Sequence, residues 1–221
     1  MEALQDLFLR LAALSHVELL LGLLLTGMVI LVLEDWRLKL WALMAQYVLV
    51  GLLLVRVMPL RVALIEIVVG GLVCLILYLT AQRVHWGREG APEVDRDRQR
   101  PARQRPMSMG WWFRLAVALL AAVVTYAVGT RHPFVEQPQG IAQASYWLVI
   151  IGLLAAVLSG SPFKVGLGLL TFQAGFGILL ASFETSLSVT ALVGVTYFLT
   201  ALAVAYLTSP ELALVLEDDG G

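Results

Sequence analysis

The stretch KVGLGLLTFQAGFGILL, residues 164–180, is hydrophobic, with a base, Lys164, at its start and one amide, Gln173, near its middle. An earlier stretch, RLKLWALMAQYVLVGLL at residues 37–53, has the same plan, with Arg37 at its start and Gln46 nine positions later. At 100° per residue, nine positions place the base and the amide on opposite faces of a helix, about 13 Å apart along its axis. Both stretches therefore predict hydrophobic helices that carry a buried amide.

These two stretches also indicate an internal duplication. They are offset by 127 residues, and a second pair of motifs, ILYLTA at 76–81 and VAYLTS at 204–209, is offset by 128 residues. Two pairs of motifs at nearly one offset are typical of a repeated unit. The sequence therefore predicts two copies of a three-helix transmembrane unit, at residues 17–81 and 145–208.

The composition is that of a membrane protein. Of the 221 residues, 60% are hydrophobic and only 14% are charged, whereas about a quarter of the residues of soluble domains are charged. The single cysteine, Cys74, excludes an internal disulfide and a cysteine-based metal site.

Seven apolar segments approach the length of about 20 residues that a transmembrane helix needs. We expect an all-α polytopic protein with spans near 17–34, 38–56, 59–81, 111–130, 145–160, 163–183 and 187–208, the fifth being the shortest. Short connections within each unit predict antiparallel neighbours. The fourth span, 111–130, links the two units and restores the direction of the chain, so the repeats should be parallel, about an axis along the membrane normal.

The remaining segments are polar. Residues 1–16 predict an amphipathic helix lying on the membrane surface, with a flexible N-terminus as the alternative. Residues 82–110 are rich in arginine, aspartate and proline and predict a disordered loop. Residues 209–221 form an acidic tail. Beside a membrane, a basic loop sets topology and touches anionic lipid, so we expect no nucleic-acid partner.

The basic residues predict the orientation. Seven arginines lie between residues 83 and 105, which places that loop in the cytoplasm, the N-terminus outside and the C-terminus inside. Counting spans outward from this loop places the basic residues at helix starts, Arg37, Lys39 and Lys164, on the inner side. Tyr146 and Trp147 should mark the outer interface.

Few polar groups lie within the predicted spans, and three are candidates for an ion or proton path: Glu66, Gln46 and Gln173. Glu66 shares a helix face with Ala63 and Gly70, so it should point at protein; pairing with Arg61 near the outer surface is the alternative. Gln173 either belongs to the path or only hydrogen-bonds to another helix. Its helix carries glycines on two opposed faces, so neighbours should pack on both sides.

The motif Trp36-Arg37-Leu38 followed by Ala45-Gln46 resembles the second helix of the hydrogenase-4 component E family, the membrane subunits of formate-hydrogenlyase-type complexes. The stretch GLLTFQAGFGILLA, residues 168–181, resembles that family's helix of the form G-x4-E-x-G-x5-A, which is similar to the NuoK subunit of respiratory complex I. The resemblance covers nearly the whole chain in length, span count and basic loop. One departure is important: Gln173, which cannot ionise, stands where the family pattern has a glutamate.

The resemblance implies a non-catalytic subunit of a proton- or sodium-translocating respiratory complex, beside antiporter-like and hydrogenase- or complex-I-like subunits, in the inner membrane of a prokaryotic cell. Two rivals remain open: a stand-alone transporter of ions or small solutes with a site between the repeats, and a membrane scaffold or assembly protein. No nucleotide-binding motif, nucleophile elbow or metal-ligand spacing is present. We therefore expect no catalytic site, metal or cofactor in this chain.

Overall fold

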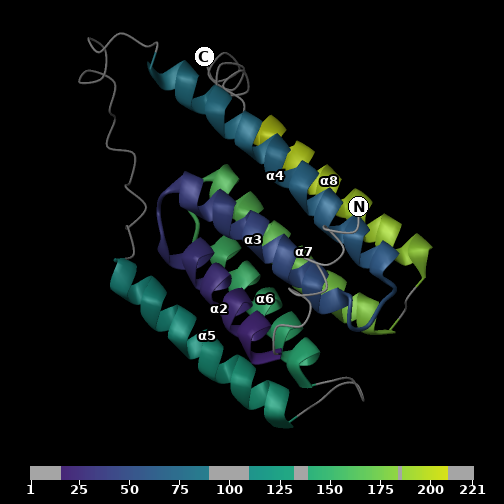
Figure 1. The fold of residues 1–221 in the computed structure, drawn as a ribbon. Coiled ribbons are helices and arrows are strands. Elements are labelled where there is room, and N and C mark those ends of the chain that lie inside the picture. Colours follow the sequence, from purple (N-terminus) through teal and green to yellow (C-terminus); the bar gives the residue numbers. More distant parts are fainter. Residues whose placement is uncertain (1–15, 90–109, 132–138, 184–185, 209–221) are drawn as a thin grey trace.

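The computed structural model describes residues 16–89, 110–131, 139–183 and 186–208 (Figure 1). The described part of the chain is helical, and it contains seven helices: α2 (His16–Val32), α3 (Trp36–Leu54), α4 (Leu60–Glu89), α5 (Trp111–Arg131), α6 (Gln139–Val157), α7 (Pro162–Phe183) and α8 (Leu187–Leu207). The predicted N-terminal surface helix, most of the basic loop and the acidic tail lie outside the described residues.

Six of these helices, α3 to α8, are long and apolar enough to cross a membrane. The described part of the chain is therefore all-α, and its six long apolar helices make this an integral membrane protein, as the composition predicts. The prediction that the segment near 145–160 is the shortest is wrong, because α6 begins at Gln139 and has 19 residues. The shortest helix among the described residues is α2, with 17 residues, at the lower limit of the length that spans a bilayer.

Helix α4 is longer than expected. It has 30 residues and continues to Glu89, although the sequence predicts a loop from residue 82 onward. At 1.5 Å per residue it measures about 45 Å, well beyond the roughly 30 Å of a hydrocarbon core. Residues 82–86 contain no glycine or proline, so the helix continues after the apolar composition ends.

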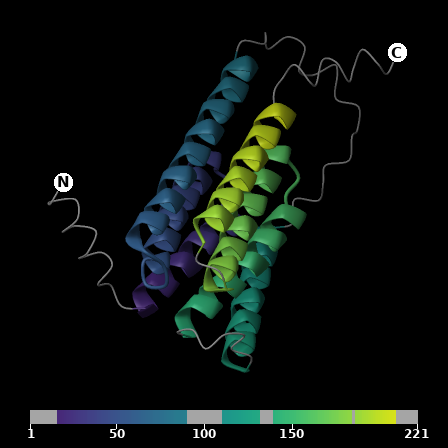
Figure 2. The same ribbon diagram turned by 90° about the vertical axis from the view of Figure 1, so that its right-hand side faces the viewer.

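The helices form two facing rows (Figures 1 and 2). In one row α3 packs between α2 and α4, and in the other α7 packs between α6 and α8. The rows meet through the pairs α2–α6, α3–α7 and α4–α8, and α5 lies at one end, against α2 and α6. Each helix of one predicted repeat thus contacts its counterpart in the other.

The contact between α2 and α6 gives their relative direction. The indole Nε1 of Trp147 donates a hydrogen bond of 3.0 Å to the carbonyl oxygen of Leu23. One turn later, a Cβ added to Gly27 would meet both Trp147 and Ile151. Residue numbers therefore rise in the same direction in both helices, as parallel repeats require. Trp147 is the ninth of the 19 residues of α6 and is 4% exposed, so it lies inside the bundle and its predicted place at the membrane interface is wrong.

A second pair of equivalent residues has the same local structure. Thr80 Oγ1 donates to the carbonyl oxygen of Ile76 at 2.8 Å, and Thr208 Oγ1 donates to that of Val204 at 2.7 Å. These four residues are related by the offset of 128. Such agreement is what a duplicated unit predicts, and the duplication itself stays a prediction.

Glycines allow α7 to touch helices on both sides. A Cβ added to Gly152 of α6 would lie 2.8 Å from the carbonyl oxygen of Gly168, and one added to Gly168 would lie 2.8 Å from that of Gly152. On the other face, Gly166 and Gly177 pack against Val204 and Tyr197 of α8. The predicted central position of this helix is confirmed.

Candidate functional site

A cluster of polar side chains lies where the row of α3 and α4 meets the row of α7 and α8. We call it the core polar cluster, and its members are Tyr47, Glu66, Gln173, Tyr197 and Thr200. Tyr47, Glu66 and Tyr197 are buried, and the other two are half-buried. The sequence predicts two of the five, Glu66 and Gln173. Packing joins these to the two tyrosines and the threonine.

Glu66 is the carboxylate of this cluster. Six residues into α4, it lies about 9 Å along the helix from Leu60, and it is 4% exposed. Its neighbours on the same face, Ala63 and Gly70, are buried against α3, which confirms that this face points at protein. The side chain of Arg61, the alternative partner, is not among those described.

Tyr197 connects Glu66 to α7. Its hydroxyl donates a hydrogen bond of 3.1 Å to the main-chain carbonyl oxygen of Gln173, and the same hydroxyl lies within hydrogen-bonding reach of the Glu66 side chain. A phenol carries one hydrogen. While that hydrogen is donated to the Gln173 carbonyl, Tyr197 can accept from Glu66 only if Glu66 is protonated.

Tyr47 completes the surroundings of Glu66. Its ring packs directly on Gly70 of α4, where a Cβ would overlap the ring, and its centroid lies 5.8 Å from that of Tyr197. Within the described residues, neither its hydroxyl nor Oε1 of Glu66 has a hydrogen-bond partner. A carboxylate oxygen and a phenol are thus buried with spare hydrogen-bonding capacity.

Neither tyrosine is predicted as a site residue from the sequence. Tyrosines of membrane proteins concentrate at the interfaces, whereas Tyr47 and Tyr197 each lie about ten residues inside a helix. That depth is a signal, because a phenol there needs a polar partner. The sequence alone does not say which helix supplies it.

Glu66 also borders a small cavity of about 20 Å³, lined in addition by residues of α3, α7 and α8 and by Met58. This volume suits about one water molecule. Its lining includes Leu54, the last residue of α3, and Val189, near the start of α8. The cavity therefore lies between Glu66 and the end of the bundle at which α4 and α8 begin.

The two matched glutamines have different environments. Gln173 Nε2 donates a 2.8 Å hydrogen bond to Thr200 Oγ1 of α8, which is the interhelical role that was one of its two predicted alternatives. Gln46 is fully buried, and neither of its amide atoms has a partner in the described part of the chain. Seven residues separate Gln46 from Lys39, so both lie on one face of α3.

The basic residues at the helix starts divide into two groups. Lys39 is 2% exposed and lies near the charges of Lys164, Arg114 and Glu34. Arg114 Nη1 is 3.5 Å from Glu34 Oε1. Arg37 is exposed, with its guanidinium carbon 5.2 Å from the centroid of the Trp36 ring. Lys39 and Lys164 thus come together, and Arg37 faces another way.

No three histidine, cysteine or acidic side chains meet at a metal-binding distance within residues 16–89, 110–131, 139–183 and 186–208. Comparison of the chain with models of protein families, with curated proteins and with solved structures gives no match, so the family resemblance stays a prediction from the sequence.

Proposed function

We propose that this protein is a non-catalytic membrane subunit of a hydrogenase-4- or complex-I-like ion-translocating respiratory complex, in which Glu66 carries a proton. The observation that supports this most directly is the setting of Glu66: a buried carboxylate, within hydrogen-bonding reach of Tyr197, beside a cavity of about one water. An ionisable group inside a membrane is costly, and it marks a functional site more often than a structural one.

The hydrogen count at Tyr197 supports a proton-carrying role. When Glu66 is protonated, it can donate to the Tyr197 oxygen while that hydroxyl donates to the Gln173 carbonyl. When Glu66 loses its proton, the Tyr197 hydroxyl has two competing acceptors and only one hydrogen. The change of one proton at Glu66 therefore changes a hydrogen bond to α7, which couples protonation to helix contacts.

A small cavity lies on one side of the cluster and further polar groups lie on the other. The cavity lies between Glu66 and the end of the bundle where α4 and α8 begin. Toward the other end, Gln46 lies at the middle of α3, and Lys39 lies about 10 Å further along that helix. A proton path through these groups needs mobile water between Gln46 and the core polar cluster.

The outer faces of the bundle suit a subunit of a larger assembly. Helix α5 exposes Leu119, Leu120 and Val123, and α8 exposes Leu192 and Leu199. Such faces contact either lipid or neighbouring membrane subunits. Together with the family resemblance, they favour a position beside antiporter-like subunits, with the redox chemistry on partner proteins.

Purification of tagged, full-length protein from its native membrane in a mild detergent tests this assignment. We expect antiporter-like and redox subunits to co-purify in stoichiometric amount. If the pure protein instead moves a solute by itself in liposomes, it is a stand-alone transporter. If it neither transports nor co-purifies with such subunits, the scaffold alternative remains.

A further inference from the structure

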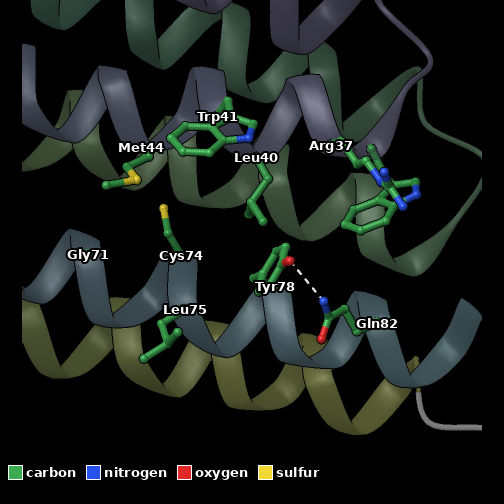
Figure 3. A pocket seen from close by; sticks show the side chains of 10 residues that line it. Arg37, Leu40, Trp41, Met44, Gly71, Cys74, Leu75, Tyr78 and Gln82 are labelled. Atoms are coloured by element: carbon green, nitrogen blue, oxygen red, sulfur yellow. Dashed lines mark hydrogen bonds between the residues drawn. The ribbon is translucent and has the colours of Figure 1, made fainter.

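A groove of about 660 Å³ runs between α3 and α4, separate from the core polar cluster. It occupies the half of the two helices near the start of α3 and the end of α4. Figure 3 shows side chains of both helices facing it, with Arg37 and Gln82 toward one end and Met44 and Gly71 toward the other.

The groove lies beside a close contact between the two helices. At that contact, an added Cβ on Gly51 would overlap the side chain of Ile67, and one on Gly70 would overlap the Tyr47 ring. One residue later, on the side of α4 that lines the groove, a Cβ added to Gly71 would meet nothing within 4 Å.

The length of the groove matches one leaflet of a bilayer. Along α3 it extends from Met44 to Trp36, about 12 Å, and along α4 from Gly71 to Gln82, about 16 Å. Half of a hydrocarbon core is about 15 Å thick. A neighbouring transmembrane helix would need a seam along the whole height of the bundle, whereas a lipid chain needs only its own leaflet.

The groove is apolar at one end and polar at the other, as a phospholipid is. Its deep part is apolar, with Leu40, Met44 and Leu75 in the lining. Its mouth carries the cation of Arg37 against the Trp36 ring. There too, Gln82 Nε2 donates a 2.8 Å hydrogen bond to the Tyr78 hydroxyl (Figure 3). An arginine beside aromatic rings at a membrane interface suits an anionic phosphate.

We propose that this groove binds an anionic phospholipid of that leaflet, with an acyl chain between α3 and α4 and the phosphate at Arg37. The proposal does not depend on the role of Glu66. It assigns to Arg37, whose position at a helix start the sequence had marked, a contact with lipid rather than a place in an ion path.

Native mass spectrometry of the purified full-length protein, incubated with equal amounts of phosphatidylglycerol and phosphatidylcholine, tests the proposal. We expect one phosphatidylglycerol to be retained in preference to phosphatidylcholine. Arg37→Gln should reduce this preference about fivefold, the effect of one basic residue near an anionic head group, and Arg37→Lys should preserve it.

A second pair of variants tests the acyl-chain site. Gly71→Phe places a ring into the open space of the groove and should remove the retained lipid. Leu72→Phe is the matched control, because Leu72 is the next residue, is exposed and does not line the groove; it should retain lipid like the unchanged protein.

Three results would overturn the proposal: equal retention of the two lipids by the unchanged protein, equal lipid loss in both phenylalanine variants, or a second protein chain that only Gly71→Phe displaces. If Gly71→Phe fails to fold, the Arg37→Gln and Arg37→Lys pair decides alone.

Discussion

Tyr47 of α3 and Tyr197 of α8 pack with their ring centroids 5.8 Å apart, 150 residues apart in the sequence, and both lie beside the carboxylate of Glu66. The two rings are similarly buried, but their hydroxyls differ. That of Tyr197 donates to the Gln173 carbonyl oxygen and lies within reach of Glu66, whereas that of Tyr47 has no hydrogen-bond partner in the described structure. This difference makes the pair a matched test of the core polar cluster.

Removal of the Tyr197 hydroxyl should destabilise the protein. Tyr197→Phe deletes the hydrogen bond to Gln173, and we expect the free energy of unfolding to fall by about 0.6 to 1.7 kcal/mol, the range for such bonds inside membrane proteins. Tyr47→Phe deletes a hydroxyl that pairs with no described group, so the free energy of unfolding should stay the same or rise. Unfolding in mixed micelles measures both, and an equal loss in the two variants would contradict the assigned hydrogen bond.

The crossing of α6 and α7 gives a second prediction. A Cβ at Gly152 would collide with the backbone of α7 near Phe172, so Gly152→Ala should lower the free energy of unfolding by about 1 to 3 kcal/mol, as overpacking does. The control is Gly71→Ala, where an added Cβ meets open space and alanine favours the helix by about 0.5 to 1 kcal/mol. Thermal unfolding in detergent should give opposite signs for the two, and a stabilising Gly152→Ala would refute the close crossing.

The orientation of the chain leads to a third prediction. In a Cys74→Ala background, a cysteine at Gly110, before α5, should react with a membrane-impermeant maleimide only from the cytoplasmic side. A cysteine at Pro59, between α3 and α4, should react only from outside. Both positions are exposed. Labelling of Gly110→Cys from outside would reverse the proposed orientation, and labelling of both positions from the same side would contradict a span formed by α4.

The sequence predicts the helices well because apolar composition and length determine them. It also predicts the central position of α7, since Gly168 and Gly166 lie on opposed faces and need close neighbours. It does not predict how far α4 extends, because a helix can continue into water beyond its apolar part. Nor does it place Trp147, whose Nε1 finds a carbonyl of α2 that only the packing brings near.

Part of the candidate site can also be predicted from the sequence. Glu66 and Gln173 are conspicuous because ionisable and amide groups are rare within spans. The contribution of Tyr197 depends on which face of α8 turns toward α4 and α7. The rotation of α8 is determined by its contacts with residues of α4 that lie more than 120 positions earlier in the sequence. Lys39 is a similar case, since its burial depends on the approach of α5 and α7.

Proton movement in the Glu66→Gln variant tests the central claim most directly. Membrane vesicles that contain the assembled complex, energised through its redox partner and monitored with a pH-sensitive dye, provide the measurement. Glu18→Gln, at an exposed carboxylate near the start of α2, is the control and should be unchanged. We predict that Glu66→Gln assembles normally but loses coupled proton movement by about 100-fold or more, the smallest contribution of a positioned proton-transfer group. Unchanged proton movement in an assembled Glu66→Gln complex would contradict the account.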